Sequence, residues 1–178
     1  YENAAAANGG GIYAKLGGQV YSCTVVSNSA ADGGGIYVEY DANIINDIIY
    51  FNSAPTNAYI APWAAAAPSY CCTIPHPGGS GHITSNPQFV DAGADDYHLQ
   101  GSSPCIDSGT ENYATSHDLD GNPRPLDGDA AGPAVVDIGC YEVYNENGDS
   151  DGDSATDGDE VIADTDPMDE TSYLHITA

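Results

Sequence analysis

Short apolar runs, separated by glycine, asparagine and serine, return at a fixed interval along the first third of the chain. The segment NGGGIY at Asn8–Tyr13 comes back as DGGGIY at Asp32–Tyr37, an interval of 24 residues. A second apolar run follows each glycine cluster, at Val20–Val26 and again at Ile44–Ile49. Runs of β-branched residues bounded by turn residues are typical of short strands, and a short fixed period is typical of a solenoid. The pattern therefore predicts an all-β fold in which 24-residue turns stack in register as a parallel β-helix.

Stacking like residues on like residues predicts which side chains face the interior. Ile60 keeps the phase of Ile12 and Ile36, although the third repeat has lost its glycine triplet. We expect these three isoleucines to lie inside, and Tyr13 and Tyr37 to lie outside. Neighbouring turns should be roughly 4.8 Å apart, the strand spacing of any sheet.

The corners of the turns carry their own pattern. Each glycine triplet suits a corner at which φ is positive. Asn28 falls over Asn52, and their amides either share hydrogen bonds between turns or cap turns at the surface. Asp47 takes the phase of Cys23 and Cys71, and the alternation does not decide which face of that strand points inward. Cys23 and Cys71 lie two turns apart, roughly 9.6 Å, which is too far for a disulfide, whose Cα atoms lie within about 7 Å.

From Thr73 onward the 24-residue period ends, and the motifs NPQFVDA, DYHLQGSSPCIDSGT, DLDGNPRPLDG and VDIGCYE follow. Together with the GGGIY repeats, these motifs resemble secreted bacterial right-handed parallel β-helix proteins, the pectate-lyase-like surface proteins of the choice-of-anchor Q type. The resemblance covers residues 1–144. It implies a right-handed β-helix with closing turns up to residue 144, and a secreted, extracellular or cell-surface location. It also implies a Cys105–Cys140 disulfide, because Cys140 stands where a small residue is expected in the final motif.

Charge narrows the choice of partner. The net charge is -25, and Lys15 and Arg124 are the only Lys or Arg residues. Nucleic acid is excluded because its binding depends on neutralising phosphates with Lys and Arg, and an anionic membrane surface is excluded for the same reason. No apolar run is long enough to insert into a bilayer. This many acidic residues either keep the protein soluble or bind divalent cations.

The acids of residues 145–170 follow a spacing of their own. Counted from Asp149, they stand at positions 1, 3, 5, 9 and 12, from which an EF-hand-like loop supplies oxygens to Ca²⁺, with a backbone carbonyl at position 7. The segment resembles the calcium repeats of thrombospondin type 3 and dockerin domains, which close with a TDP element. The predicted ligands of Ca²⁺ are Asp149, Asp151, Asp153, the carbonyl of Ala155, Asp157, Glu160, Asp164 and Asp166. Ser154 replaces the usual glycine at position 6, and the alternative is a solvated acidic linker.

Residues 171–178 alternate in polarity like one further strand. The chain begins inside a repeat, so we expect it to be a piece of a longer protein whose first turn leaves a sheet edge open. Strand addition to such an edge predicts a head-to-tail homo-oligomer that grows as a filament.

Evidence for catalysis is thin in the sequence. Parallel β-helices often carry polysaccharide lyases and hydrolases. For a lyase, the only candidate bases, Lys15 and Arg124, lie far apart, whereas carboxylates that could pair for hydrolysis are plentiful. The five histidines, His76, His82, His98, His117 and His175, show no metal-binding spacing. The five cysteines suggest disulfides rather than catalytic thiols. We therefore expect a non-enzymatic structural or adhesive module, with a polysaccharide-binding or polysaccharide-degrading protein as the alternative, because fold alone does not determine function.

Overall fold

A computed structural model describes residues 1–60, 68–129, 133–149, 151, 153, 155–163, 165, 167, 169 and 171. In these residues strands dominate and helix is almost absent, so the chain is all-β as predicted. The strands are β1 (Ile12–Ala14), β2 (Gly18–Tyr21), β3 (Thr24–Val26), β4 (Ile36–Val38), β5 (Ala42–Ile45), β6 (Ile48–Tyr50), β7 (Ala58–Ile60), β8 (Cys72–Thr73), β9 (Phe89–Asp91) and β10 (Asp96–Leu99). The helices are the 3-10 helix η1 (Ala92–Ala94) and the α-helix α1 (Asp157–Ala163).

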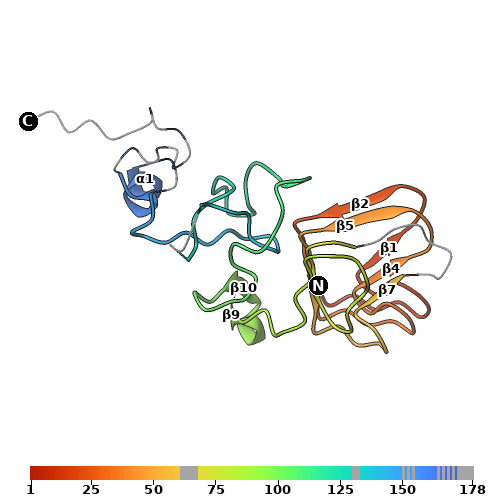
Figure 1. Ribbon diagram of the computed structural model, residues 1–178. Coiled ribbons are helices and arrows are strands. Elements are labelled where there is room, and N and C mark those ends of the chain that lie inside the picture. Colours follow the sequence, from red (N-terminus) through yellow and green to blue (C-terminus); the bar gives the residue numbers. More distant parts are fainter. Residues whose placement is uncertain are drawn as a thin grey trace, which may run out of the picture.

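The first eight strands form three parallel sheets, which we call the strand stack. Their orders are β1-β4-β7, β2-β5 and β3-β6-β8, and Figure 1 shows β2 and β5 at one side of the stack and β1, β4 and β7 at another. Ile12 pairs with Ile36, and the β2–β5 and β3–β6 pairs keep the same interval. The 24-residue register predicted between the first two repeats is therefore confirmed in all three sheets.

The third repeat departs from the predicted register. Ile60 pairs with Val38, whereas Ile36 pairs with Ala58, so the interval here is 22 residues (60 − 38) and the expected stacking of Ile60 on Ile36 is wrong. The reason lies in the corner before β7, which has lost the glycine triplet and is two residues shorter. The interval returns to 24 where Ile48 pairs with Cys72.

Apolar side chains fill the interior of the stack. Ile36, Val38, Ile44 and Ile49 are fully buried in one cluster, with Ile12 partly buried against it. Tyr13 is exposed, as predicted, but Tyr37 is buried. The rings of Tyr13 and Tyr37 stack at 5.3 Å, nearly parallel, so the first ring covers the second from solvent.

The corners are stabilised by amide ladders and by glycine. Asn28 Nδ2 donates to Asn52 Oδ1 at 3.1 Å, and Asn3 Nδ2 donates to Asn28 Oδ1 at 3.0 Å. Asn28 is 1% exposed, so of the two alternatives the shared hydrogen bonds between turns are the correct one. The first glycine of each triplet has positive φ, +67° at Gly9 and +59° at Gly33, as the corner prediction requires.

Beyond β8 the chain stops adding long repeats and folds back along the stack. Residues 84–129 and 133–144, here called the closing segment, include the antiparallel pair β9–β10. The Cys140 amide donates to Thr24 Oγ1 at 3.2 Å, and Asn46 Nδ2 donates to the carbonyl of Thr110 at 2.7 Å. The closing segment thus contacts the first and second repeats from the side, where closing turns had been expected. In Figure 1 the stack occupies one end of the molecule and α1 the other.

Candidate metal centre

The predicted calcium loop folds so that its first three acids converge. Carboxylate oxygens of Asp149, Asp151 and Asp153 lie within 4.8 Å of one another. Asp151 Oδ1 accepts the amide of Asp153 at 3.1 Å, and Asp153 Oδ1 accepts the amide of Ala155 at 2.7 Å. One oxygen of each carboxylate therefore shapes the loop. The second oxygens, Asp151 Oδ2 and Asp153 Oδ2, are buried without a hydrogen-bond partner among the described residues.

Glu160 closes the centre from the first turn of α1. It is 1% exposed, and neither Oε1 nor Oε2 has a hydrogen-bond partner in the described part of the chain. Burial, followed by the nearby carboxylates of Asp151 and Asp153, raises the pKa of Glu160 to about 7. Burying a carboxylate without a partner is costly, and here other carboxylates surround it. A divalent cation bound among these carboxylates would offset the cost of burying them together.

The structure brings together most of the ligand set predicted from the sequence. Asp157 is fully buried at the start of α1, and its amide donates to the carbonyl of Gly148 at 2.9 Å, which closes the loop on itself. Ala155 lies in the same loop between Asp153 and Asp157. Asp164 and Asp166 lie outside the described residues, as does Ser154.

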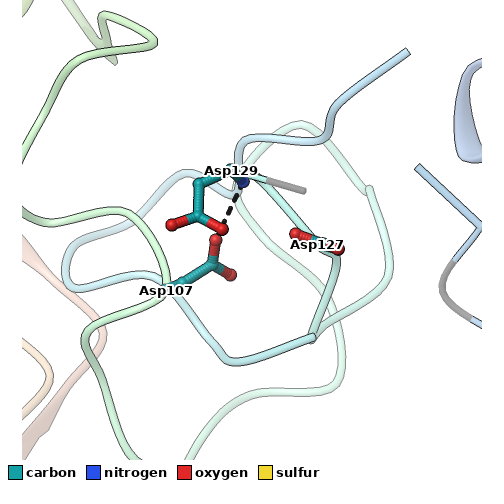
Figure 2. A group of neighbouring side chains, drawn as sticks. All are labelled: Asp107, Asp127 and Asp129. Atoms are coloured by element: carbon teal, nitrogen blue, oxygen red, sulfur yellow. Dashed lines mark hydrogen bonds between the residues drawn. The ribbon is translucent and has the colours of Figure 1, made fainter. Parts of the chain in front are cut away.

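A second group of acids was not predicted. Figure 2 shows Asp107 facing Asp127 and Asp129, with one carboxylate oxygen of each within 4.8 Å of the others. The Asp129 amide donates to Asp107 Oδ2 at 3.0 Å, and burial raises the pKa of the Asp107 carboxyl. Asp107 therefore holds the 127–129 turn through the backbone. No sequence spacing indicates the group, because long-range folding of the closing segment creates it.

The two bases weighed for catalysis have structural partners. Arg124 Nε lies 3.2 Å from Glu142 Oε2, and both side chains are fully buried. Lys15 pairs with Glu39 at 3.1 Å on the surface. Arg124 belongs to the interior of the closing segment and Lys15 to the corner after β1, so the structure does not bring them into one site.

The four described histidines lie in three separate surroundings. His98 lies between Asp96 and Asp120, at 2.6 Å and 2.8 Å. The ring of His82 contacts that of His76 at 4.9 Å, and His117 bonds to its neighbour Ser116. His175 lies outside the described residues.

The predicted Cys105–Cys140 disulfide is not formed in this structure, in which all five cysteines are free. Because the closing segment folds back along the stack, its two cysteines reach different repeats. Cys140 lines a cavity of about 390 Å³ together with Cys23 and His117, whereas Cys105 is buried against Cys72.

Asp47, whose orientation the sequence left open, points inward. It is 0% exposed, and its Oδ1 accepts the amide of Cys23 at 2.8 Å. Asp47 Oδ2 has no hydrogen-bond partner among the described residues, and burial raises the pKa of this carboxyl to about 8. Burial therefore favours the protonated, neutral form of Asp47 inside the stack.

Comparison of the chain with models of known families, with characterised proteins and with solved structures gave no match. Within the described residues no helix has the length and apolar character needed to span a membrane.

Proposed function

We propose that the chain is a calcium-binding parallel β-helix module with a structural or adhesive role outside the cell. The observation that carries the proposal is Glu160, a buried carboxylate with two unpartnered oxygens facing other acids. The three parallel sheets support the β-helix, since each repeat supplies one strand to each sheet in the first two turns. We propose that the β-helix is right-handed, because the GGGIY repeats and the closing motifs resemble those of right-handed β-helix proteins.

Calcium fits the chemistry of the loop better than other common cations. Ca²⁺ is a hard cation that takes six to eight oxygen ligands in flexible geometry. The loop offers carboxylates at positions 1, 3, 5, 9 and 12 and a carbonyl at Ala155, with no sulfur or nitrogen donor. A glutamate at position 12 contributes two oxygens in such loops, and both Glu160 oxygens are available.

The direct test is isothermal titration of the full chain with CaCl₂ at pH 7.5. Wild type should bind one Ca²⁺ at the loop, and Glu160→Gln should weaken that site at least about tenfold, because it removes a charged ligand while keeping the shape. Asp159→Asn is the matched control, since Asp159 is an exposed acid on the same helix, and its affinity should stay within about twofold of wild type. Equal binding by wild type and Glu160→Gln would contradict the assignment.

We include head-to-tail assembly in this proposal. In the sheet orders β1, β2 and β3 are each terminal strands, and terminal strands present backbone groups that another strand can pair with. The predicted donor, residues 171–178, lies almost wholly outside the described residues. Deleting residues 171–178 should leave a folded monomer, whereas the full chain should form larger species by light scattering and electron microscopy. If both chains assembled equally, residues 171–178 would not be the strand donor.

A second candidate function, binding of a neutral polysaccharide, is favoured by one cavity. This cavity of about 270 Å³ is lined by two aromatic rings and three amides: Phe51, Phe89, Asn86, Gln88 and Gln100. Phe51 is 48% exposed, and exposed rings with neighbouring amides suit the apolar faces and hydroxyl groups of sugars. Affinity electrophoresis in neutral polysaccharides tests it: Phe51→Ala should lose retardation that wild type shows, and an unretarded wild type would reject it.

A further inference from the structure

Two of the five thiols meet in the interior. Cys72 in β8 and Cys105 in the closing segment are both 0% exposed and belong to one buried cluster, and the nearby Cys105 side chain raises the pKa of the Cys72 thiol. Cys71 is equally buried but packs into the other cluster, on the opposite side of the backbone. Of two adjacent cysteines, only Cys72 therefore faces Cys105.

Independent contacts bring Cys72 and Cys105 to the same short stretch of chain. Cys72 Sγ donates to the carbonyl of Ser85 at 3.4 Å. Ser103 Oγ donates to the carbonyl of Pro87 at 2.6 Å and accepts the amide of Cys105 at 3.1 Å. Both cysteines are thus positioned against residues 85–87, one from the stack and one from the closing segment.

We propose that Cys72 and Cys105 are a disulfide pair. This disulfide would link the closing segment covalently to β8, the last strand of the β3-β6-β8 sheet. The link would close a loop between positions 33 residues apart (105 − 72). Such a cross-link restricts the unfolded chain and so favours the folded state.

The oxidant for this step is a low-molecular-weight disulfide such as oxidised glutathione. One cysteine thiolate attacks a glutathione sulfur, the S–S bond of glutathione breaks, and one glutathione thiolate leaves. The second cysteine thiolate attacks the mixed disulfide and releases the second glutathione. The two cysteines are oxidised, the glutathione disulfide is reduced, and the two cysteine protons end on the released thiols. Because both thiols are fully buried, the exchange takes place during folding, before the closing segment covers them.

The test is oxidative refolding of the full chain from urea in a glutathione buffer, then alkylation of remaining thiols and chymotryptic mapping without reductant. Cleavage after aromatic residues places Cys72 within residues 71–89 and Cys105 within residues 98–113. The expected product is a single link between these two peptides, with Cys23 and Cys140 alkylated. A link from Cys105 to Cys140, or alkylation of all five cysteines, would overturn the proposal.

Chymotrypsin releases Cys71 and Cys72 in the same peptide, so variants are needed to show which of the two forms the disulfide. Cys71→Ala should keep the link and Cys72→Ala should lose it; retention of the link in Cys72→Ala would overturn the pairing. A second readout does not depend on that variant folding. Reductant should lower the Tm of oxidised wild type by roughly 10 °C and leave the Tm of Cys105→Ala unchanged. An equal Tm for wild type with and without reductant would also contradict the link.

Discussion

Buried carboxyl groups set much of the chemistry of this acidic chain at the scale of single residues. Asp47, Asp137 and Glu160 are each at most 1% exposed, and burial raises the pKa of each. Asp137 accepts backbone amides at both oxygens. Asp47 lies among the thiols and apolar side chains of the stack, which suits a neutral acid, whereas Glu160 faces other carboxylates, which suits a cation.

Asp47 gives a pH prediction with a definite sign. Its pKa in the folded chain is about 8, against 3.8 for the unfolded chain, so the folded state holds the proton more tightly. Its effect on stability is therefore absent below about pH 4, and stability falls as the pH rises from there to about 8. Asp47→Asn should remove this slope while keeping the acceptor for the Cys23 amide.

The measurement is the free energy of unfolding in urea at pH 5 and pH 8, for wild type and Asp47→Asn. The loss of stability between the two pH values should be smaller in Asp47→Asn by about 1 kcal/mol or more. Identical pH profiles for the two proteins would show that Asp47 is not a buried neutral acid.

At the scale of single elements, the glycine corners offer a matched pair of substitutions. Gly33 has φ +59°, and a Cβ added there would lie 2.3 Å from the carbonyl oxygen of Ile36. Gly17 also has positive φ, +78°, but an added Cβ would meet nothing within 4 Å. Gly33→Ala should therefore destabilise the fold by about 1–3 kcal/mol more than Gly17→Ala, measured by urea unfolding. Equal losses would mean that backbone strain alone, and not the close approach, sets the requirement for glycine.

The β10 strand is joined to the rest of the closing segment by His98. The hydrogen bond to Asp120, opposed by burial and assisted by Asp96, raises the pKa of His98, and its ring stacks on Tyr141 at 3.9 Å. A raised histidine pKa stabilises the fold fully below about pH 6.5 and loses that effect as the pH rises through the folded pKa. Because these groups are largely exposed, the contribution is at most about 1 kcal/mol.

Asp120→Asn tests this contact directly. The pKa of His98, followed by NMR titration of its ring protons, should fall in Asp120→Asn, whereas Asp159→Asn at the distant α1 should leave it unchanged. An unchanged His98 pKa in Asp120→Asn would show that His98 and Asp120 do not form this ion pair.

Sequence reasoning worked best for elements that repeat. The strands of the first two turns and their register follow from β-branched runs at a constant interval, because in-register stacking places like on like. It failed at β7, where a shortened corner moved Ile60 by two residues. It also failed in the closing segment, because the approach of Cys105 to Cys72 and of Asp107 to Asp129 depends on how an irregular segment folds back. The acids around Glu160 were predictable because all of their spacing is local.

At the scale of the whole molecule, the net charge of -25 links assembly to cation binding. Like charges oppose the approach of a second copy, and bound cations lower that repulsion. The acidic loop lies beyond the closing segment, at the end of the molecule away from the strand stack (Figure 1). Calcium there would fix the chain that leads into residues 171–178, the predicted strand donor.

Native mass spectrometry of the full chain in calcium-containing buffer can show whether one Ca²⁺ binds at the loop closed by Glu160. Wild type should retain one tightly bound Ca²⁺ after exchange into calcium-free buffer, and Asp159→Asn should do the same. Glu160→Gln should retain none. A wild-type chain without calcium, or a Glu160→Gln chain that holds calcium as firmly as wild type, would show that Glu160 does not close a calcium site.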